Sequence, residues 1–158
     1  THQIEFMKKA GYGHDKIIRN LKKRGIPYEM IESSLSTRMD DERENAQKYA
    51  RRIQQTHRHD SVRKTRDYIR SAMIRQGFSS DLASDVVEHM DFSENQLRED
   101  DNLRHCIQKA TRRLAHQYSG KELKDRVFRS CVSQGFRYED INAAMNETEW
   151  YDEENQRF

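Results

Sequence analysis

An all-α fold of repeated helical units is predicted by three features: a glycine register, a scarcity of helix-breaking residues and a low apolar content. Gly25, Gly77 and Gly135 each follow apolar residues at eight and four positions upstream, and each precedes Ile or Phe and, ten positions downstream, another apolar residue. Such a pattern, repeated in register, is typical of a structural repeat. One proline and six glycines in 158 residues leave few interruptions to helices. The composition, 34% apolar and 35% charged, favours an elongated stack of small units over one thick core.

The helix that ends at Gly25 shows the features of the repeat most clearly. Ile17, Ile18 and Leu21 fall at helical spacing and give this helix one apolar stripe. The cations of Lys22–Arg24 complement the negative end of the helix, and glycine then supplies a left-handed stop. We expect Gly77 and Gly135 to end helices in the same way, with positive φ angles.

A second helix follows each of these stops. In the first unit, Pro27 suits the first helical turn, where its missing N–H costs nothing. Met30, Ile31 and Leu35 are then predicted to form the buried stripe of that helix.

A third, leading helix completes each unit. Gln47–Ile53 resembles Gln108–Leu114, and each segment lies one helix upstream of its glycine. Three three-helix units are therefore predicted: residues 1–39, with an incomplete leading helix in residues 3–10; residues 40–92; and residues 93–158, with an acidic tail. Residues 91–101 are expected to form an acidic joint. Because the chain begins with Thr1, we expect it to be a fragment or a processed chain.

Charge alternates along the chain in bands. Residues 41–78 hold ten Lys and Arg against five Asp and Glu, whereas residues 79–101 hold one against eight. The same change recurs between residues 102–137, with nine against two, and residues 138–158, with one against seven. The first two helices of each later unit are thus expected to be basic, and the third acidic.

Motifs for catalysis, cofactors or metals are not found, and an enzyme is not expected. No phosphate-binding glycine motif or HExxH motif is present. His57 and His59 lack further ligands at metal-binding spacing, so we expect a solvated loop there. Cys106 and Cys131 fall at apolar helical positions, which favours reduced, buried thiols and a cytoplasmic protein. No segment is apolar enough to span a bilayer, so no membrane partner is expected. We also expect the chain to be a monomer.

The basic helices are the one indication of a functional surface. An Arg-Arg pair, at residues 51–52 and 112–113, lies in the leading helix of two units and favours a periodic partner such as a nucleoprotein filament or a duplex backbone. A solvated face that keeps the helices soluble is the alternative. The candidate partner-binding residues are Lys22, Lys23, Arg24, Lys48, Arg51, Arg52, Arg63, Lys64, Arg66, Lys109, Arg112 and Arg113.

One stretch of the chain resembles a known family. Gly11-Tyr12-Gly13, followed by Ile17, Leu21 and Gly25-Ile26, resembles the middle repeat of RecX-type regulatory proteins. Residues 41–46 resemble the connection to that family's next repeat, and Ile69–Phe92 resembles that repeat. The added segment Asn95–Trp150 looks like the extra repeat of longer Gram-positive members. The family's amino-terminal repeat is absent, and His14 stands where the family often has proline.

The resemblance implies a non-enzymatic modulator of the RecA recombinase. RecX-type proteins lie along the groove of the RecA–DNA filament and restrain its ATP hydrolysis and strand exchange, and so recombination and the SOS response. The partner would be the RecA filament, with single- or double-stranded DNA also open to contact. The alternative is a non-specific module that binds the DNA backbone. Sequence-specific reading of DNA is disfavoured, because the helix after each later turn is acidic and phosphates would repel it.

Overall fold

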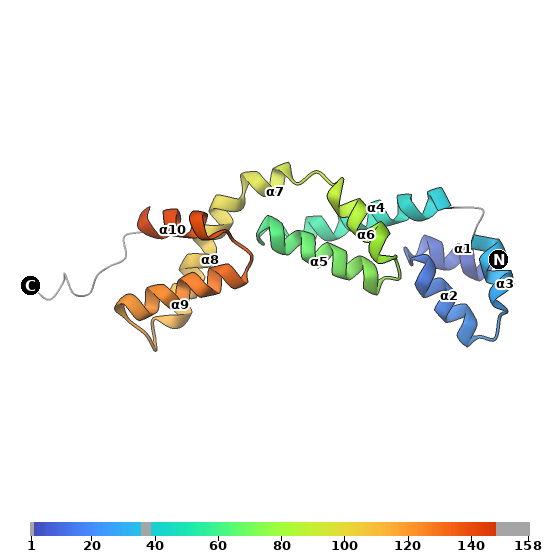
Figure 1. Ribbon diagram of the computed structural model, residues 1–158, viewed down its shortest axis with the longest axis horizontal. Helices are drawn as coiled ribbons and strands as arrows, with labels where there is room; N and C mark the ends of the chain where they lie inside the picture. The colour runs from blue at the N-terminus through green and yellow to red at the C-terminus, as the bar shows by residue number, and fades with distance from the viewer. Residues whose placement is uncertain (1, 36–38, 148–158) are drawn as a thin grey trace, which may run out of the picture. The chain divides into compact units, whose positions relative to one another are not determined.

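The computed structural model describes residues 2–35 and 39–147 of the chain. These residues fold into helices, with no strand among them, so the predicted all-α class is confirmed for this part of the chain (Figure 1). None of the helices described is long and apolar enough to cross a membrane. The acidic tail predicted at the end of the third repeat falls on residues 148–158, which lie outside the described residues. The helices are α1 His2–Lys9, α2 His14–Lys23, α3 Tyr28–Leu35, α4 Met39–Thr56, α5 Val62–Arg75, α6 Ser80–Glu88, α7 Ser93–Leu97, α8 Glu99–Leu114, α9 Gly120–Ser133 and α10 Tyr138–Glu147.

The chain divides into two compact units. Unit 1 comprises Thr1–His57 and Arg66–Asp91, and unit 2 comprises Arg58–Thr65 and Phe92–Phe158. The first residues of α5 therefore belong to unit 2 and the rest of that helix to unit 1. The finer division into three repeats, with joints after residues 39 and 92, stays a prediction.

The three glycines of the register end their helices through the same hydrogen bonds. Their φ angles are +80° at Gly25, +101° at Gly77 and +91° at Gly135, so the predicted positive φ is confirmed. Each glycine N–H donates to the carbonyl three residues back, at 2.9–3.0 Å, and the N–H of the next residue donates to the carbonyl five residues back, at 3.1–3.3 Å. This is the Schellman arrangement, in which an apolar residue after the glycine closes over the last helical turn.

The first core of unit 1 lies between α1, α2 and α3. Ile17 and Leu21 of α2 face Ile31 and Leu35 of α3, and all four are buried with apolar residues of α1. The prediction that Met30 is buried is wrong, since 63% of its surface is exposed. Met30 immediately precedes Ile31, so it points about 100° around the helix from the inward stripe.

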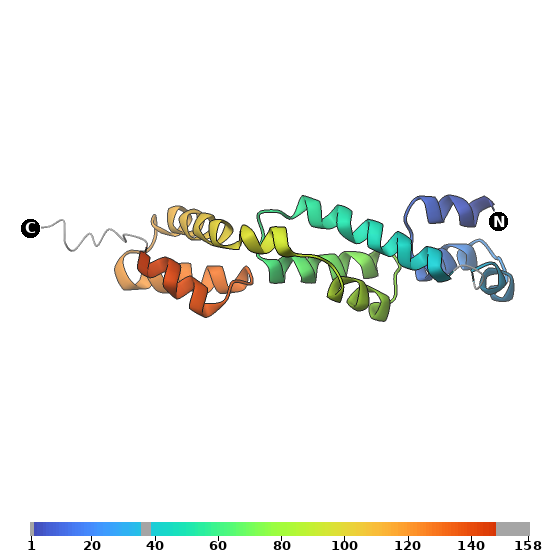
Figure 2. The same cartoon turned by 90° about the horizontal axis from the view of Figure 1, so that it is seen from above.

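A second core of unit 1 lies where α4 packs against α6. Ala46 and Ala50 of α4 are fully buried, and their small side chains let the two helices approach closely. Phe78, directly after the glycine stop, is also buried, and its ring centroid lies 6.1 Å from that of Tyr49. Figure 2 shows α5 running beside α4. Ser79 caps α6, since its hydroxyl accepts from the N–H of Leu82 at 3.1 Å.

The core of unit 2 is formed by α8, α9 and α10. Leu103, Ile107 and Ala110 of α8 are buried together with Val127 and Phe136, among others. The segment predicted as an acidic joint, residues 91–101, contains α7 and the start of α8. Acidic residues at Glu99–Asp101 favour this start, since carboxylates stabilise the positive end of a helix.

Helix starts dock onto glycine turns in both units, in two different ways. In unit 1 the N–H of Gly13 donates to the carbonyl of Gln76 at 2.9 Å, and the N–H of Asp15 donates to that of Gly77 at 3.0 Å. A Cβ on Gly13 would lie 2.2 Å from the carbonyl carbon of Gly77, so only glycine allows this approach. The N–H of His14 donates to the Glu42 carboxylate at 3.1 Å, and His14 Nδ1 lies 3.0 Å from the other oxygen.

In unit 2 the corresponding dock uses side chains. Ser61, buried at the start of α5, donates its hydroxyl to the carbonyl of Gln134 at 2.7 Å and accepts from the N–H of Lys64 at 3.1 Å. The Glu99 carboxylate accepts from the N–H of Val62 at 3.3 Å. The helix α2 begins at His14, three residues before the buried Ile17, whereas α5 begins at Val62, seven residues before the buried Ile69. The amino-terminal part of α2 is therefore about one helical turn shorter than that of α5.

Candidate functional site

The predicted basic residues are distributed over both units. Most are exposed, and Lys64 is half-buried. Unit 1 carries seven of them: Lys22, Lys23 and Arg24 at the end of α2, Lys48, Arg51 and Arg52 on α4, and Arg66 on α5. Unit 2 carries five: Arg63 and Lys64 on the first turn of α5, and Lys109, Arg112 and Arg113 on α8.

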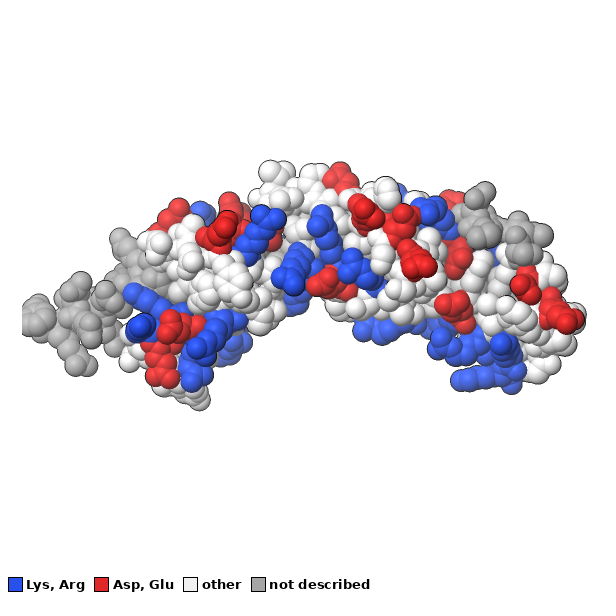
Figure 3. Space-filling view, viewed as in Figure 1, with Lys and Arg blue, Asp and Glu red and all other residues white. Residues whose placement is uncertain are grey.

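The cations at the end of α2 face solvent. Figure 3 shows Lys and Arg side chains gathered over α2, and Asp and Glu side chains over α6. Lys22 Nζ lies 4.7 Å from the ring centroid of Tyr28, which is close enough for a cation–π contact. Positive charge at this end of α2 also complements the negative end of the helix dipole, so these residues have a structural role besides any binding role.

The three cations of α4 are held by their own helix. Lys48 Nζ pairs with Glu44 at 3.1 Å, and Arg51 Nε donates to the carbonyl of Gln47 at 3.3 Å. Arg52 lies over the Tyr49 ring at 5.6 Å. These contacts are exposed and local, so they stabilise the fold little and leave the charges accessible to a partner.

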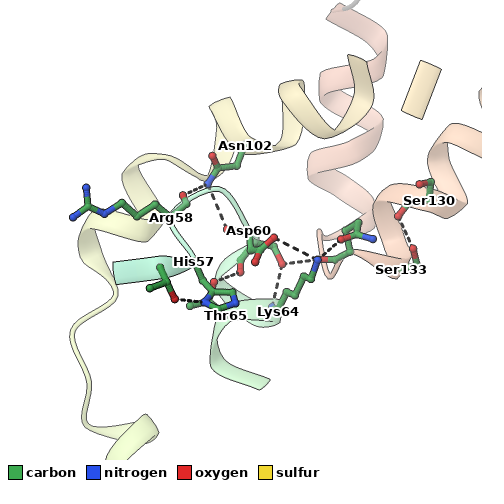
Figure 4. A network of polar contacts seen from close by, with 11 residues as sticks. His57, Arg58, Asp60, Lys64, Thr65, Asn102, Ser130 and Ser133 are labelled. Carbon is green, nitrogen blue, oxygen red and sulfur yellow. Dashed lines mark hydrogen bonds and ion pairs between the residues drawn. The ribbon is translucent and has the colours of Figure 1, made fainter. Parts of the chain in front are cut away.

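Lys64 is part of a polar network in unit 2 (Figure 4). Its Nζ donates to Gln134 Oε1 at 2.5 Å and pairs with Asp60 at 3.4 Å. Asn102 of α8 holds the loop between α4 and α5 in place, because its amide donates to the carbonyls of Arg58 at 2.9 Å and Asp60 at 3.4 Å. The network fixes the start of α5 against the other helices of unit 2.

The cations of α8 surround a basic cleft, which we call the α8 cleft. This open cavity of about 670 Å³ is lined by His105, Gln108, Lys109, Arg112, Arg113 and His116. No carboxylate lines it, so its three permanent cations favour an anionic partner. A smaller neighbouring cavity of about 300 Å³ shares His105, Lys109 and Arg113, and Lys64 and Asp60 also line it. Arg113 is oriented by donating to Ser130 Oγ at 3.1 Å.

Sequence reasoning identified the cations of the α8 cleft and missed its histidines. Lys109, Arg112 and Arg113 were candidates because of their spacing on one helix, and Lys64 joins their neighbourhood only through the fold. His105 and His116 fall four residues before Lys109 and four after Arg112. That spacing places them on the same side of a helix, and it was the signal available to find them.

The two similar segments of α4 and α8 do not occupy equivalent positions. Ala46 and Ala50 are the buried residues of α4, and Leu103 and Ile107 are buried with the same spacing in α8. The carboxylates that accept from the docked helix starts follow the same spacing, since Glu42 lies four residues before Ala46 and Glu99 lies four residues before Leu103. The Arg-Arg pair of α8 therefore lies one helical turn further along than the pair of α4. The two helices thus share an Arg-Arg pair in their sequences, but the two pairs do not occupy equivalent positions in the structure.

Acidic residues gather at the end of α6. Asp85, Glu88 and His89 bring their ligand atoms within 4.8 Å of one another, and this is the one such group among the residues that the structure describes. All three are exposed or half-exposed, and Asp85 pairs with Arg43 at 2.5 Å. Such a group is ordinary for a solvated helix end. His57 stacks on Tyr68 at 4.0 Å and does not belong to it.

The chain is similar in sequence to known regulatory proteins. The RecX regulatory protein of Bacillus licheniformis is 30% identical over 141 residues, which are 89% of this chain and 53% of that protein. The RecX regulatory protein of Streptococcus pyogenes serotype M3 is 31% identical over 80 residues, 51% of this chain and 31% of that protein. The resemblance to RecX-type regulatory proteins is confirmed.

Further RecX relatives extend the similarity over most of the chain. The protein of Streptococcus agalactiae serotype III is 24% identical over 132 residues, 83% of this chain and 50% of that relative. The chain thus spans about half the length, or less, of the curated RecX proteins that it matches. No family model and no solved structure matches it.

Proposed function

We propose that this chain binds the RecA–DNA filament and restrains its ATP hydrolysis and strand exchange, as a regulator and not as an enzyme. The observation that carries the proposal is the similarity to RecX regulatory proteins over 89% of the chain. By restraining the filament, the chain would limit recombination and the SOS response. The all-helical fold agrees with this role, and the basic helices offer cations to a partner.

The α8 cleft is the surface that we assign to the partner. Lys109, Arg112 and Arg113 project from one helix without a carboxylate among the residues that line the cleft. Carboxylates or phosphates of the filament would meet these cations with complementary charge, which speeds association and selects the partner. The cations at the end of α2 and on α4 are proposed as further contacts, within unit 1.

Reading of base sequence by the acidic helices is not part of the proposal. Asp81 lies in the first turn of α6, and Glu139 and Asp140 lie in the first turn of α10. A helix that enters the major groove does so through its amino-terminal residues, and carboxylates there would be repelled by phosphate.

The test measures ATP hydrolysis by RecA on single-stranded DNA with increasing amounts of this chain. The α8 variant Lys109→Glu/Arg112→Glu is compared with a matched α9 variant, Lys121→Glu/Arg129→Glu, which reverses two exposed charges outside the α8 cleft. Circular dichroism first establishes that both variants fold. The α8 variant should need roughly tenfold more protein for half inhibition, since two lost charge contacts cost about 1.4 kcal/mol. Equal inhibition by parent and α8 variant would refute the assignment of the cleft.

Non-specific binding to the DNA backbone is the second candidate function. The cations of the α8 cleft support it as well, because phosphates match their charge. Titrations against bare DNA at several salt concentrations separate the two candidates. If the residues contact phosphate, each lost contact should lower the salt dependence by about one unit of slope. If they contact protein carboxylates, charge reversal should weaken filament binding and leave bare DNA binding unchanged.

A further control is needed because the chain spans only about half the length of its RecX relatives. If the chain neither binds nor inhibits the filament, while the complete Bacillus licheniformis protein inhibits it, the activity depends on residues beyond this chain. That result would refute the proposal for the chain itself.

A further inference from the structure

Two cysteines meet in the core of unit 2. Cys106 lies on α8 and Cys131 on α9, both thiols are free, and their sulfur atoms are 3.7 Å apart. A disulfide requires about 2.0 Å between the sulfurs, so the two sulfur atoms must move closer to each other before they can bond. The expectation of reduced thiols agrees with the structure, but the expectation of burial holds only for Cys131.

The two thiols differ in access and in surroundings. Cys131 is fully buried, whereas Cys106 is half-buried and lines the cavity of about 300 Å³. The cations of Lys64, Lys109 and Arg113 line the same cavity, and the charged or titratable residues beside them are Asp60, His59 and His105. A small neutral oxidant therefore reaches Cys106 from solvent, in a mostly positive environment, and reaches Cys131 only through it.

The pKa values of the two thiols diverge for the same reasons. The pKa of Cys106 is lowered to about 7, first because Cys131 donates a hydrogen bond to its sulfur and further because Lys64, Arg113 and Lys109 stabilise a thiolate. Burial opposes this shift. The pKa of Cys131 is raised, because its proton is held in that hydrogen bond and burial disfavours its charge. At neutral pH, Cys106 is the nucleophile and Cys131 the thiol that keeps its proton.

We propose that Cys106 and Cys131 are a peroxide-reactive pair, in which Cys106 is oxidised by a hydroperoxide and Cys131 resolves the product to a disulfide between α8 and α9. The Cys106 thiolate attacks one oxygen of the peroxide, the O–O bond breaks, and the departing hydroxide takes a proton to form water. The resulting sulfenic acid is attacked by the Cys131 sulfur, the S–S bond forms, and the S–O bond breaks. The Cys131 proton leaves with the hydroxide as a second water. The two thiols lose two electrons together, and the peroxide gains them.

A metal site is a weaker explanation of the pair. Structural zinc needs four ligands, and a third ligand atom near the two sulfurs would be the minimum sign of such a site. Within residues 2–35 and 39–147, the one group of three ligand atoms that lie close together is that of Asp85, Glu88 and His89. The inference is independent of the proposed partner, because it concerns chemistry that the chain performs alone.

The experiment treats the reduced full chain with hydrogen peroxide at pH 7 and maps the products by mass spectrometry. We expect an intramolecular Cys106–Cys131 disulfide, seen as the loss of two hydrogen atoms and reversed by a dithiol reductant. In the Cys131→Ala variant, Cys106 should accumulate as a sulfenic acid that a diketone probe traps. In the Cys106→Ser variant, Cys131 should stay unmodified, because it is buried. If Cys131→Ala does not fold, Cys131→Ser replaces it.

The rate of oxidation supplies a second measurement. In folded chain the rate should level off near pH 7, and in urea-denatured chain near the ordinary thiol pKa of about 8.5. At pH 7 the folded chain should react about threefold faster, because a roughly fifteenfold gain in thiolate is partly offset by its lower nucleophilicity. Lys109→Gln/Arg113→Gln should slow the reaction, and Lys121→Gln/Arg129→Gln should not. The proposal is overturned by disulfides only between chains, or by equal rates in folded and denatured protein.

Discussion

Unit 1 and unit 2 contain the same kind of contact between a helix start and a glycine turn, but different chemical groups make it. In each, the start of a helix docks onto the turn that follows a glycine-ended helix. Unit 1 makes this contact through bare backbone, with the N–H of Gly13 bonded to the carbonyl of Gln76. Unit 2 makes it through a side chain, with Ser61 bonded to the carbonyl of Gln134. The backbone dock tolerates no added atom, whereas the side-chain dock depends on one hydroxyl. The two units should therefore fail through different substitutions.

The largest expected effect is that of Gly77→Ala in unit 1. A Cβ at this position would lie 2.2 Å from Lys16 Cβ and 2.6 Å from the Lys16 nitrogen, and φ is +101°. Left-handed strain and overpacking together should lower the free energy of unfolding by about 3 kcal/mol. Gly25→Ala is the matched control, because φ there is +80° with nothing within 4 Å. It should cost only the strain, about 1 kcal/mol.

Urea unfolding followed by circular dichroism measures both losses. Gly135→Ala should fall between them, since the Cβ would meet the movable Ser61 hydroxyl at 2.7 Å before any backbone atom. Equal losses at the three glycines would show that close approach contributes nothing, and that the two docks are alike.

Ser61→Ala is expected to have the largest effect of a polar substitution in unit 2. It removes a buried hydroxyl that bonds the carbonyl of Gln134 and also caps α5 through the N–H of Lys64. We expect a loss of about 2 kcal/mol, because a buried carbonyl and a helix N–H lose their partner together. Ser119→Ala is the matched control, since Ser119 precedes α9 without a side-chain cap bond and is exposed. A comparable loss at both serines in urea unfolding would contradict the role of the dock.

Local features of this molecule were predictable from the sequence, and contacts between segments far apart in the chain were not. The stops at Gly77 and Gly135 were predictable because each depends on residues within one helical turn. The exposure of Met30 was missed, since an apolar residue beside a stripe resembles a member of it. The dock of Gly13 onto Gly77 joins residues 64 positions apart, and nothing local specifies it. For the same reason, Lys64 could not be placed beside the cations of α8 from spacing alone.

Glu42→Ala tests the carboxylate of the unit 1 dock and should have a smaller effect. The substitution removes bonds to the N–H of His14 and to its ring nitrogen. We expect a loss of about 1 kcal/mol at pH 7 in chemical unfolding. Glu44→Ala is the control, because Glu44 forms only an exposed pair with Lys48 within α4. The assignment fails if both variants lose the same stability.

A pH titration of the parent checks the same dock. Burial lowers the pKa of His14 below its usual value, more than Glu42 raises it. The unfolded chain therefore binds the proton more readily, and the contribution to stability is present above the unfolded pKa of about 6.5 and lost as pH falls through the folded value. His14→Gln should remove this dependence. A dependence that survives the substitution would place its origin elsewhere.

The smallest effect is expected for Glu99→Gln in unit 2, and its sign is opposite. Burial raises the pKa of Glu99, and Asp140 and Asp100 add to the shift, whereas the bond from the N–H of Val62 opposes it. A glutamine oxygen can still accept that bond without the charge, so the variant should gain a few tenths of a kcal/mol at pH 7.

The raised pKa of Glu99 means that the parent is stabilised fully below about pH 4.5 and loses that stability as pH rises through the folded pKa. The gain should therefore vanish in acid, when Glu99 of the parent is protonated too. Thermal unfolding of parent and variant between pH 4 and pH 7 measures this difference. A loss of stability at pH 7 would instead show that the charge of Glu99 holds the start of α5, as the charge of Glu42 holds His14, and that the two docks use their carboxylates alike.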